Sequence, residues 1–105
     1  MYRATTPTIT FRFPENIDMT QASDVKVTFK SKRYGYELTK EADDLIVEEQ
    51  SVAVLLSQEE TWEFGLGSSE AQINWLYNEG TVTKRACSNI VALTINENLL
   101  NEVWE

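Results

Sequence analysis

The sequence predicts an all-β fold in which antiparallel strands form a sandwich or a barrel. Seven segments alternate apolar and polar residues, as strands with one buried face do, and they recur at intervals of roughly a dozen residues. Short stretches rich in Gly, Asn and acidic residues separate them. No intervening stretch is long enough for the helix that crosses over a parallel sheet, so neighbouring strands are expected to pair antiparallel.

The first predicted strand lies in the stretch TTPTITFRFPEN at residues 5–16. Pro7 and Pro14 bracket it, and because proline has no N–H to donate, this strand suits the edge of a sheet. An edge strand is where another chain can add, while the polar face with Arg12 and threonines can equally serve to keep other chains away. The apolar face carries Ile9, Phe11 and Phe13.

Six further segments continue the pattern. The last of them is long and reads as one strand or as two strands joined by a kink. Before it, Gly80 is expected to take the left-handed conformation in a three-residue hairpin loop at 78–80. The segments are DVKVTFK (24–30), YGYEL (34–38), DDLIVEE (43–49), SVAVLL (51–56), EAQINWLY (70–77) and TVTKRACSNIVALTI (81–95).

Two short helical segments are predicted between and after the strands. Ser57 and Glu60 have the spacing of a capping box, which predicts a helical turn near 57–62, with Trp62 tucked beneath the sheets. In the tail NENLLNEVWE, two apolar pairs lie at i, i+4 spacing and predict a short C-terminal helix. A helix this short needs packing, on its own domain or on a neighbouring chain. The pairs are Leu99 with Val103 and Leu100 with Trp104.

Length and composition predict one soluble globular domain over residues 1–105. The hydrophobic content of 42% and the charged content of 25% are typical of a folded protein and not of a disordered one. No run of about 18 apolar residues predicts a membrane span. The stretch MYRATTPTIT lacks the apolar segment of a secretory signal, so none is expected. Cys87 is the single cysteine, which excludes an internal disulfide and suits a reducing compartment.

The formal net charge is −8, and the acids are concentrated in one region. Residues 37–63 contain nine carboxylates against Lys40 alone. A chain this acidic repels phosphate backbones, so nucleic acid is not an expected partner. Four bases lie close in sequence, either as a local positive patch or, more simply, as solvated strand faces. They are Lys26, Lys30, Lys32 and Arg33.

The residue types needed for common catalytic chemistry are missing. The chain has no histidine, which removes the usual general base and most zinc and iron sites. Cys87 lies in a strand pattern and is interpreted as a small apolar residue. Adjacent carboxylates on a strand point to opposite faces, so they do not form the paired acids of a glycosidase. We therefore expect a protein that is not an enzyme and that has no metal or cofactor.

Two functions remain open. The first is an assembly module that docks onto other chains through its edges and termini, and the second is a small carbohydrate- or ligand-binding β-sandwich. An apolar patch formed by termini and edge strand favours the first, and a concave aromatic platform favours the second. Four aromatic residues follow the inward alternation and are expected to fill the core: Tyr34, Tyr36, Trp75 and Tyr77. The candidate partner contacts are Tyr2, Ile9, Phe11, Leu100 and Trp104.

Four stretches, spread over nearly the whole chain, carry a family resemblance. The characteristic pieces are TTPT before an FxF strand, LSQEET, and SNIVALTINENL. The chain resembles small immunoglobulin-like proteins encoded among the tail genes of Gram-positive phages and prophages, which are related to the N-terminal domain of baseplate upper proteins. The stretches are RATTPTITFRFP, VKVTFKSK, VAVLLSQEETWEF and AQINWLYNEGTVTKRACSNIVALTINENL.

The resemblance implies an immunoglobulin-like β-sandwich of about seven strands. It also implies a structural or tail-assembly role, through self-association or contact with other tail components, in the bacterial cytoplasm during assembly or in the virion. It supplies no active-site residues. Baseplate proteins continue into shoulder and receptor-attachment domains, whereas this sequence ends at Glu105, so host-receptor binding is not part of the expectation.

Overall fold

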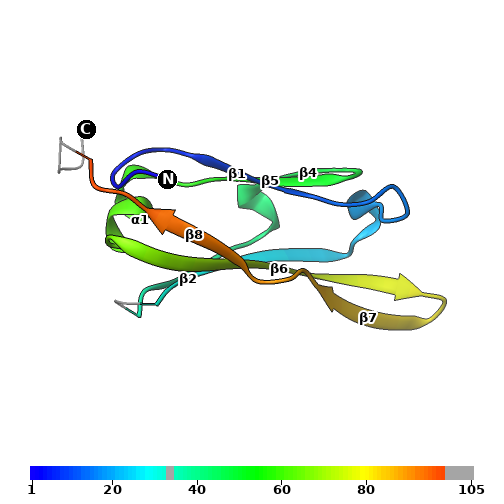
Figure 1. The fold of residues 1–105 in the computed structure, drawn as a ribbon. Coiled ribbons are helices and arrows are strands. Elements are labelled where there is room, and N and C mark those ends of the chain that lie inside the picture. The colour runs from blue at the N-terminus through cyan, green and yellow to red at the C-terminus, as the bar shows by residue number, and fades with distance from the viewer. Residues whose placement is uncertain (33–34, 99–105) are drawn as a thin grey trace.

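Two antiparallel sheets pack face to face, so the protein is an all-β sandwich (Figure 1). The computed structural model describes residues 1–32 and 35–98. One sheet has the order β1-β5-β4; the other has the order β3-β2-β6-β7, with β8 also paired to β6. The elements are β1 (Thr8–Arg12), β2 (Asp24–Ser31), β3 (Glu37–Lys40), β4 (Leu45–Glu48), β5 (Ser51–Leu55), α1 (Gln58–Glu63), β6 (Gly67–Glu79), β7 (Val82–Cys87) and β8 (Val91–Ile95), with short 3-10 turns η1 (Met19–Gln21) and η2 (Ala42–Asp44).

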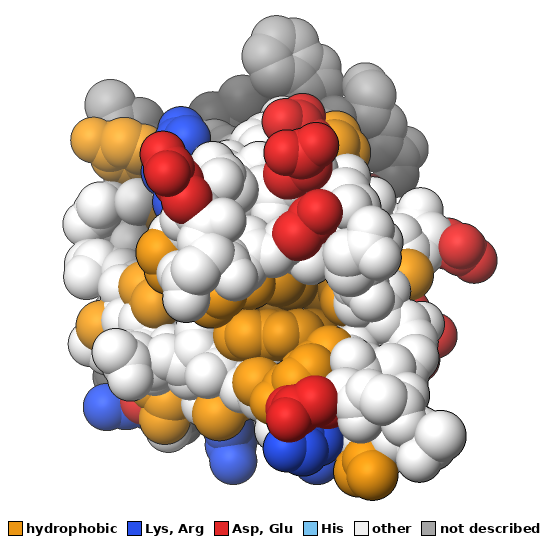
Figure 2. All heavy atoms as spheres, turned by 90° about the vertical axis from the view of Figure 1, so that its right-hand side faces the viewer, with side chains coloured by type: hydrophobic (Ala, Val, Ile, Leu, Met, Phe, Trp, Pro, Cys, Tyr) orange, Lys and Arg blue, Asp and Glu red, His pale blue; other side chains and the backbone are white. Residues whose placement is uncertain are grey.

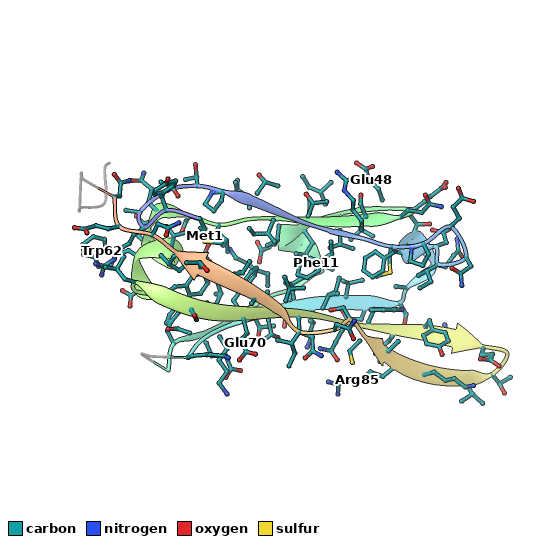
Figure 3. The ribbon with its side chains drawn as sticks, viewed as in Figure 1. Met1, Phe11, Glu48, Trp62, Glu70 and Arg85 are labelled. Atoms are coloured by element: carbon teal, nitrogen blue, oxygen red, sulfur yellow. The ribbon has the colours of Figure 1, made fainter. Side chains whose placement is uncertain are left out.

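The core lies between the sheets and follows the alternation of the sequence. In β2 every second side chain is buried, while Lys26 and Lys30 point to solvent on the other face. Phe11 of β1 points into the same space from the opposite sheet (Figure 3). β1 pairs with β5 alone, which places it at a sheet edge as its flanking prolines predicted. The buried core residues are Phe11, Met19, Val25, Val27, Phe29, Val52, Val54, Leu56, Phe64, Ala71, Ile73 and Ile95.

The described residues form eight strands because the last predicted segment is interrupted. β7 pairs with the second half of β6 and β8 with its first half. At the kink, the Ser88 N–H donates to the carbonyl oxygen of Ile73 at 2.9 Å, and the Ile73 N–H donates to Ser88 Oγ at 3.2 Å. The side-chain amide of Gln72 donates to the Ser88 carbonyl oxygen at 2.9 Å. Side chains thus satisfy backbone groups that an interrupted ladder would leave unpaired.

The helical turn predicted from Ser57 and Glu60 is confirmed as α1. The Ser57 N–H donates to Glu60 Oε1 at 2.8 Å, and the Glu60 N–H donates to Ser57 Oγ at 3.1 Å, which closes the capping box. The prediction for Trp62 is wrong: this ring is half-buried and lies against the guanidinium of Arg3, 3.7 Å from its centroid. Phe64, immediately after α1, is the aromatic residue that enters the core.

The N-terminal residues pair with the strand end near the C-terminus. The Arg3 N–H donates to the carbonyl oxygen of Asn96 at 2.9 Å, and the Asn96 N–H donates to that of Met1 at 2.7 Å. These pairs hold residues 1–3 beside Asn96, at the end of the sandwich where α1 lies (Figure 1). The predicted C-terminal helix falls on residues 99–105, which lie outside the described residues. Within residues 1–32 and 35–98, no helix has both the length and the apolar character required to cross a bilayer.

The hairpin of β6 and β7 extends beyond the sandwich as an arm (Figure 1). β2 covers β6 only as far as Leu76, so the last residues of β6 pair with β7 alone. The arm contributes to a longest dimension of 51 Å against 24 and 21 Å for the other two axes. Glu79 pairs with Val82, so the turn has two residues and not the three predicted. Gly80 has a φ of +63°, the left-handed conformation predicted for it.

Candidate functional site

The acidic pairs of the sequence lie at separate, exposed places. Asp43 and Asp44 lie in η2 and Glu49 follows β4, all of them exposed, and no group of three or more metal-ligating side chains occurs among the described residues. Cys87 is exposed at the end of β7. Asp43, Asp44 and Glu49 therefore stay solvated. Of the adjacent pairs, only Glu59 and Glu60 include a half-buried member, Glu60.

The half-buried ion pair of Lys40 and Glu60 ties β3 to α1. The ammonium lies 2.7 Å from Glu60 Oε2, and both side chains are about one-sixth exposed. Burial acts to raise the pKa of Glu60, but the hydrogen bond and charge of Lys40 and the Ser57 N–H outweigh it and hold that pKa below its ordinary value. Burial first, and then the charges of Glu60 and Glu63, raise the pKa of the neighbouring Tyr36. The ion pair of Lys40 and Glu60 therefore supports the fold, because Glu60 also closes the capping box of α1.

The predicted partner contacts lie in different environments. Tyr2 is 58% exposed beside the bridge to Asn96, and Ile9 is half-buried against the core. Phe11 is 8% exposed and belongs to the core itself. Leu100 and Trp104 lie outside the described residues. Two of the four residues in the predicted basic cluster are paired: Lys26 lies 3.6 Å from Glu41 and Lys32 lies 4.0 Å from Glu70. Lys30 is exposed on β2 without an ion pair to a described residue, and Arg33 is outside the described part.

The outer surface of the sheet β1-β5-β4, here called the three-strand face, exposes apolar side chains. Ile46 is 63% exposed and Leu55 is 59% exposed, and Ala53 lies between them, opposite Ile46. The threonines of β1 complete the surface next to β5. Sequence reasoning missed this face, although the signal was present: Ile46 and Leu55 are apolar at positions that the alternation assigns to solvent. The face comprises Thr8, Thr10, Ile46, Ala53 and Leu55.

Charged residues occur only at one end of this face. Arg12 of β1 and Glu48 of β4 stand on either side of Ser51 in the same row of the sheet. Figure 3 shows Glu48 on the outer side of its sheet. The two side chains lie two strands apart, roughly 10 Å, and they form no ion pair with each other or with another described residue. Each charge is therefore available to a partner.

A second surface is a hollow at the end of the sandwich from which the arm projects. It has a volume of about 450 Å³ and opens to solvent. Figure 2 looks onto this end, where apolar side chains gather in a depression. The inner side of the arm forms one wall, and the connection from β1 to β2 forms the other. The hollow is lined by Asn16, Ile17, Asp18, Gln21, Ala22, Trp75, Tyr77, Asn78 and Ala86.

Several polar groups in the hollow keep their hydrogen-bonding capacity. The side-chain amides of Asn16 and Gln21 and the Tyr77 hydroxyl form no hydrogen bond with other described residues. Asp18 uses Oδ1 to accept the Thr20 N–H at 3.0 Å, as the cap of η1, and Oδ2 stays available. Trp75 and Tyr77 were predicted to fill the core, but only Trp75 packs against it, and Tyr77 lies farther along the arm.

Comparison with known proteins gives no match to a family model, a curated protein or a solved structure. The fold and its surfaces define the class instead: a small all-β sandwich with one exposed apolar sheet face and one aromatic hollow.

Proposed function

We propose that this protein is a non-enzymatic structural or assembly subunit of a phage or prophage tail, with an immunoglobulin-like sandwich that acts through protein–protein contacts. The observation that carries the proposal is the three-strand face, which presents Ile46 and Leu55 to solvent on a sheet with two open edges. The family resemblance of the sequence supplies the tail-gene context. The work of such a subunit takes place in the bacterial cytoplasm during assembly or in the finished particle.

The three-strand face has the chemistry of a contact surface. Isolated exposed apolar residues are common, but here Ile46 and Leu55 lie diagonally across neighbouring strands on one outer sheet surface, with no charge between them. Fully covering Ile46 or Leu55 would contribute roughly 1.5–3 kcal/mol per side chain. A protein partner supplies the apolar cover that such a face needs.

The partner that fits this face best is a second copy of the same chain. A two-fold axis parallel to β5 lays β1 of one copy over β4 of the other, because β1 and β4 flank β5 on opposite sides. Arg12 then faces Glu48 of the second copy, and the reciprocal pair forms as well. At the centre, Ala53 and Leu55 pack against their own equivalents. The face is thus complementary to itself in charge and, along β5, in apolar character, while Ile46 lies over Thr10 of the second copy.

The size of the face predicts a weak contact. Three strands of four or five residues cover roughly 14 by 17 Å, which places the interface at or below the low end of specific complexes. Such an interface associates in the micromolar to millimolar range. A weak contact is adequate where neighbouring subunits are arrayed and many contacts form together.

Sedimentation velocity over about 10 μM to 1 mM tests this proposal. We expect a dimer at high concentration, and loss of that dimer in the double variant Ile46→Glu, Leu55→Glu. Val82→Glu is the matched control, because Val82 is 55% exposed but lies on the arm. Circular dichroism verifies that each variant is folded.

A charge exchange tests the two-fold arrangement. Arg12→Glu and Glu48→Arg should each weaken the dimer, because each places like charges opposite one another, and the double variant should restore it. A chain that stays monomeric at 1 mM, or a dimer that survives both Glu substitutions, contradicts the assignment of this face.

A further inference from the structure

We propose that the hollow between the arm and residues 16–22 binds a neutral saccharide. This site lies at the end of the sandwich, apart from the three-strand face, and it adds a ligand to the proposed assembly role. Four features of the hollow support it: two aromatic side chains, unpartnered polar groups, a lining without cations, and an open shape.

The aromatic side chains stand on one side of the same strand. Trp75 and Tyr77 are two residues apart on β6, so their Cα atoms are separated by about 6.8 Å along it. The faces of aromatic rings carry partial negative charge and attract the C–H groups on the flat side of a pyranose ring. Trp75 packs edge to face with Phe13, which does not line the hollow, with ring centroids 5.3 Å apart. The contact with Phe13 therefore fixes the Trp75 ring before a ligand binds.

The polar groups match the hydroxyl groups of a sugar. A hydroxyl both donates and accepts, so it needs partners of both kinds. The amides of Asn16 and Gln21 supply donors and acceptors, the Tyr77 hydroxyl supplies one of each, and Asp18 Oδ2 supplies an acceptor. A purely apolar partner would leave these groups desolvated without hydrogen bonds, at a cost of roughly 1–3 kcal/mol each. This cost favours a polyhydroxylated ligand over an apolar side chain.

The charges near the hollow disfavour an anionic ligand. The lining contains one carboxylate, Asp18, and no lysine or arginine. On the adjoining arm, the Lys84 ammonium is 3.0 Å from Glu79 Oε2, and Arg85 donates to Asn74 Oδ1 at 3.1 and 3.0 Å. These cations already have partners. A phosphorylated or carboxylated sugar would meet Asp18 without a compensating charge.

The arm carries the aromatic wall of the hollow, and the outer part of the arm is supported by contacts between its own two strands. A two-stranded hairpin is only marginally stable by itself. Beyond β2, cross-strand contacts hold it: Thr83 Oγ1 donates to Asn78 Oδ1 at 3.0 Å, and Lys84 pairs with Glu79. The hollow beside it has about 450 Å³, a size within the range of ligand sites, and its opening to solvent suits one or two rings of a longer chain.

Titration of the ¹⁵N-labelled full chain with chitotriose, cellotriose and maltotriose, followed by NMR, tests the proposal. We expect at least one probe to shift the Trp75 indole and the Asn16 and Gln21 side-chain amides, with a dissociation constant on the order of 1 mM. Tyr77→Ala and the double variant Asn16→Ala, Gln21→Ala should each weaken binding about tenfold or more. Tyr2→Ala, which removes an exposed tyrosine at the opposite end of the molecule, should leave it unchanged.

A second set of measurements distinguishes loss of the site from unfolding, and a neutral sugar from a charged ligand. Trp75→Phe keeps an aromatic ring on Phe13, so it should stay folded and weaken binding. Glucose 6-phosphate should bind more weakly than glucose. The proposal is overturned if none of the three neutral probes shifts these signals at about 20 mM, if Tyr77→Ala binds as well as the original chain, or if the phosphorylated sugar binds better. Leu55→Glu should not affect binding, which separates this site from the three-strand face.

Discussion

Phe13 and Trp75 meet edge to face, with ring centroids 5.3 Å apart and ring planes at 78°. Phe13 directly follows β1, and Trp75 lies on β6, so this contact joins the two sheets at the end where the arm begins. The same contact closes the core and supports the hollow. Stability and the proposed saccharide binding therefore depend on the same pair of rings.

Replacing Phe13 by alanine should destabilise the protein and loosen the hollow. Removing a half-buried ring with an edge-to-face partner should lower the free energy of unfolding by about 2 kcal/mol. Urea denaturation measures this loss, and the Trp75 indole signal should broaden or shift in the folded variant. Tyr2→Ala should change the free energy by less than about 0.5 kcal/mol. Equal losses in the two variants would show that Phe13 does not join the sheets.

Thr61 anchors the N-terminal segment to α1. Its hydroxyl accepts the Thr5 N–H at 3.0 Å and donates to the Thr5 carbonyl oxygen at 2.9 Å, in a fully buried position. Thr61→Val keeps the shape of the side chain but leaves these backbone groups without partners. The free energy of unfolding should therefore fall by roughly 1–3 kcal/mol. Thr94→Val, on an exposed position of β8, provides the control in thermal or urea denaturation. If Thr61→Val leaves the free energy of unfolding unchanged, water replaces the hydroxyl as the partner of these backbone groups.

The lowered pKa of Glu60 predicts an acid-dependent part of the stability. A carboxyl whose folded pKa lies below its ordinary value of 4.5 contributes stability above that value, and the contribution disappears as the pH falls through the folded pKa. Glu60→Gln keeps the acceptor of the capping box but removes the charge. The variant should be less stable than the original chain at pH 7, and the difference should shrink below pH 4.5.

Glu59→Gln is the matched control for this effect, because it removes the same charge from an exposed position on α1. Urea denaturation between about pH 2.5 and 7 gives the free energy of unfolding for all three proteins. If the Glu60→Gln difference is the same at both ends of this range, the charge of Glu60 does not stabilise the fold.

The turn at the tip of the arm requires a left-handed residue. Gly80 has a φ of +63°, and an added Cβ would meet no atom within 4 Å, so only backbone strain opposes a side chain. Gly80→Val should cost roughly 1–2 kcal/mol, whereas Gly80→Asn should be tolerated because Asn adopts this conformation more readily. Faster amide exchange in residues 77–84 measures the loss, and similar rates in both variants would contradict the strain.

The sequence by itself determined the local elements of this protein. Alternation predicted the strands, although β3 begins at Glu37 and shares only two residues with the predicted segment 34–38. The prolines around β1 marked an edge, and the pair Ser57 and Glu60 predicted α1. These features were readable because they depend on neighbouring residues: the side-chain period of two in a strand, the missing N–H of proline, and the reach of a cap over three residues.

The surfaces were decided by the tertiary structure alone. Phe11 was predicted to contact a partner, but the structure buries it between the two sheets. Ile46 and Leu55 are neighbours because β4 pairs with β5. The hollow joins residues 16–22 to residues 75–86, far apart in the chain. Local patterns state which face of a strand is apolar, but which strands adjoin, and how far one extends past another, follows from long-range pairing and packing.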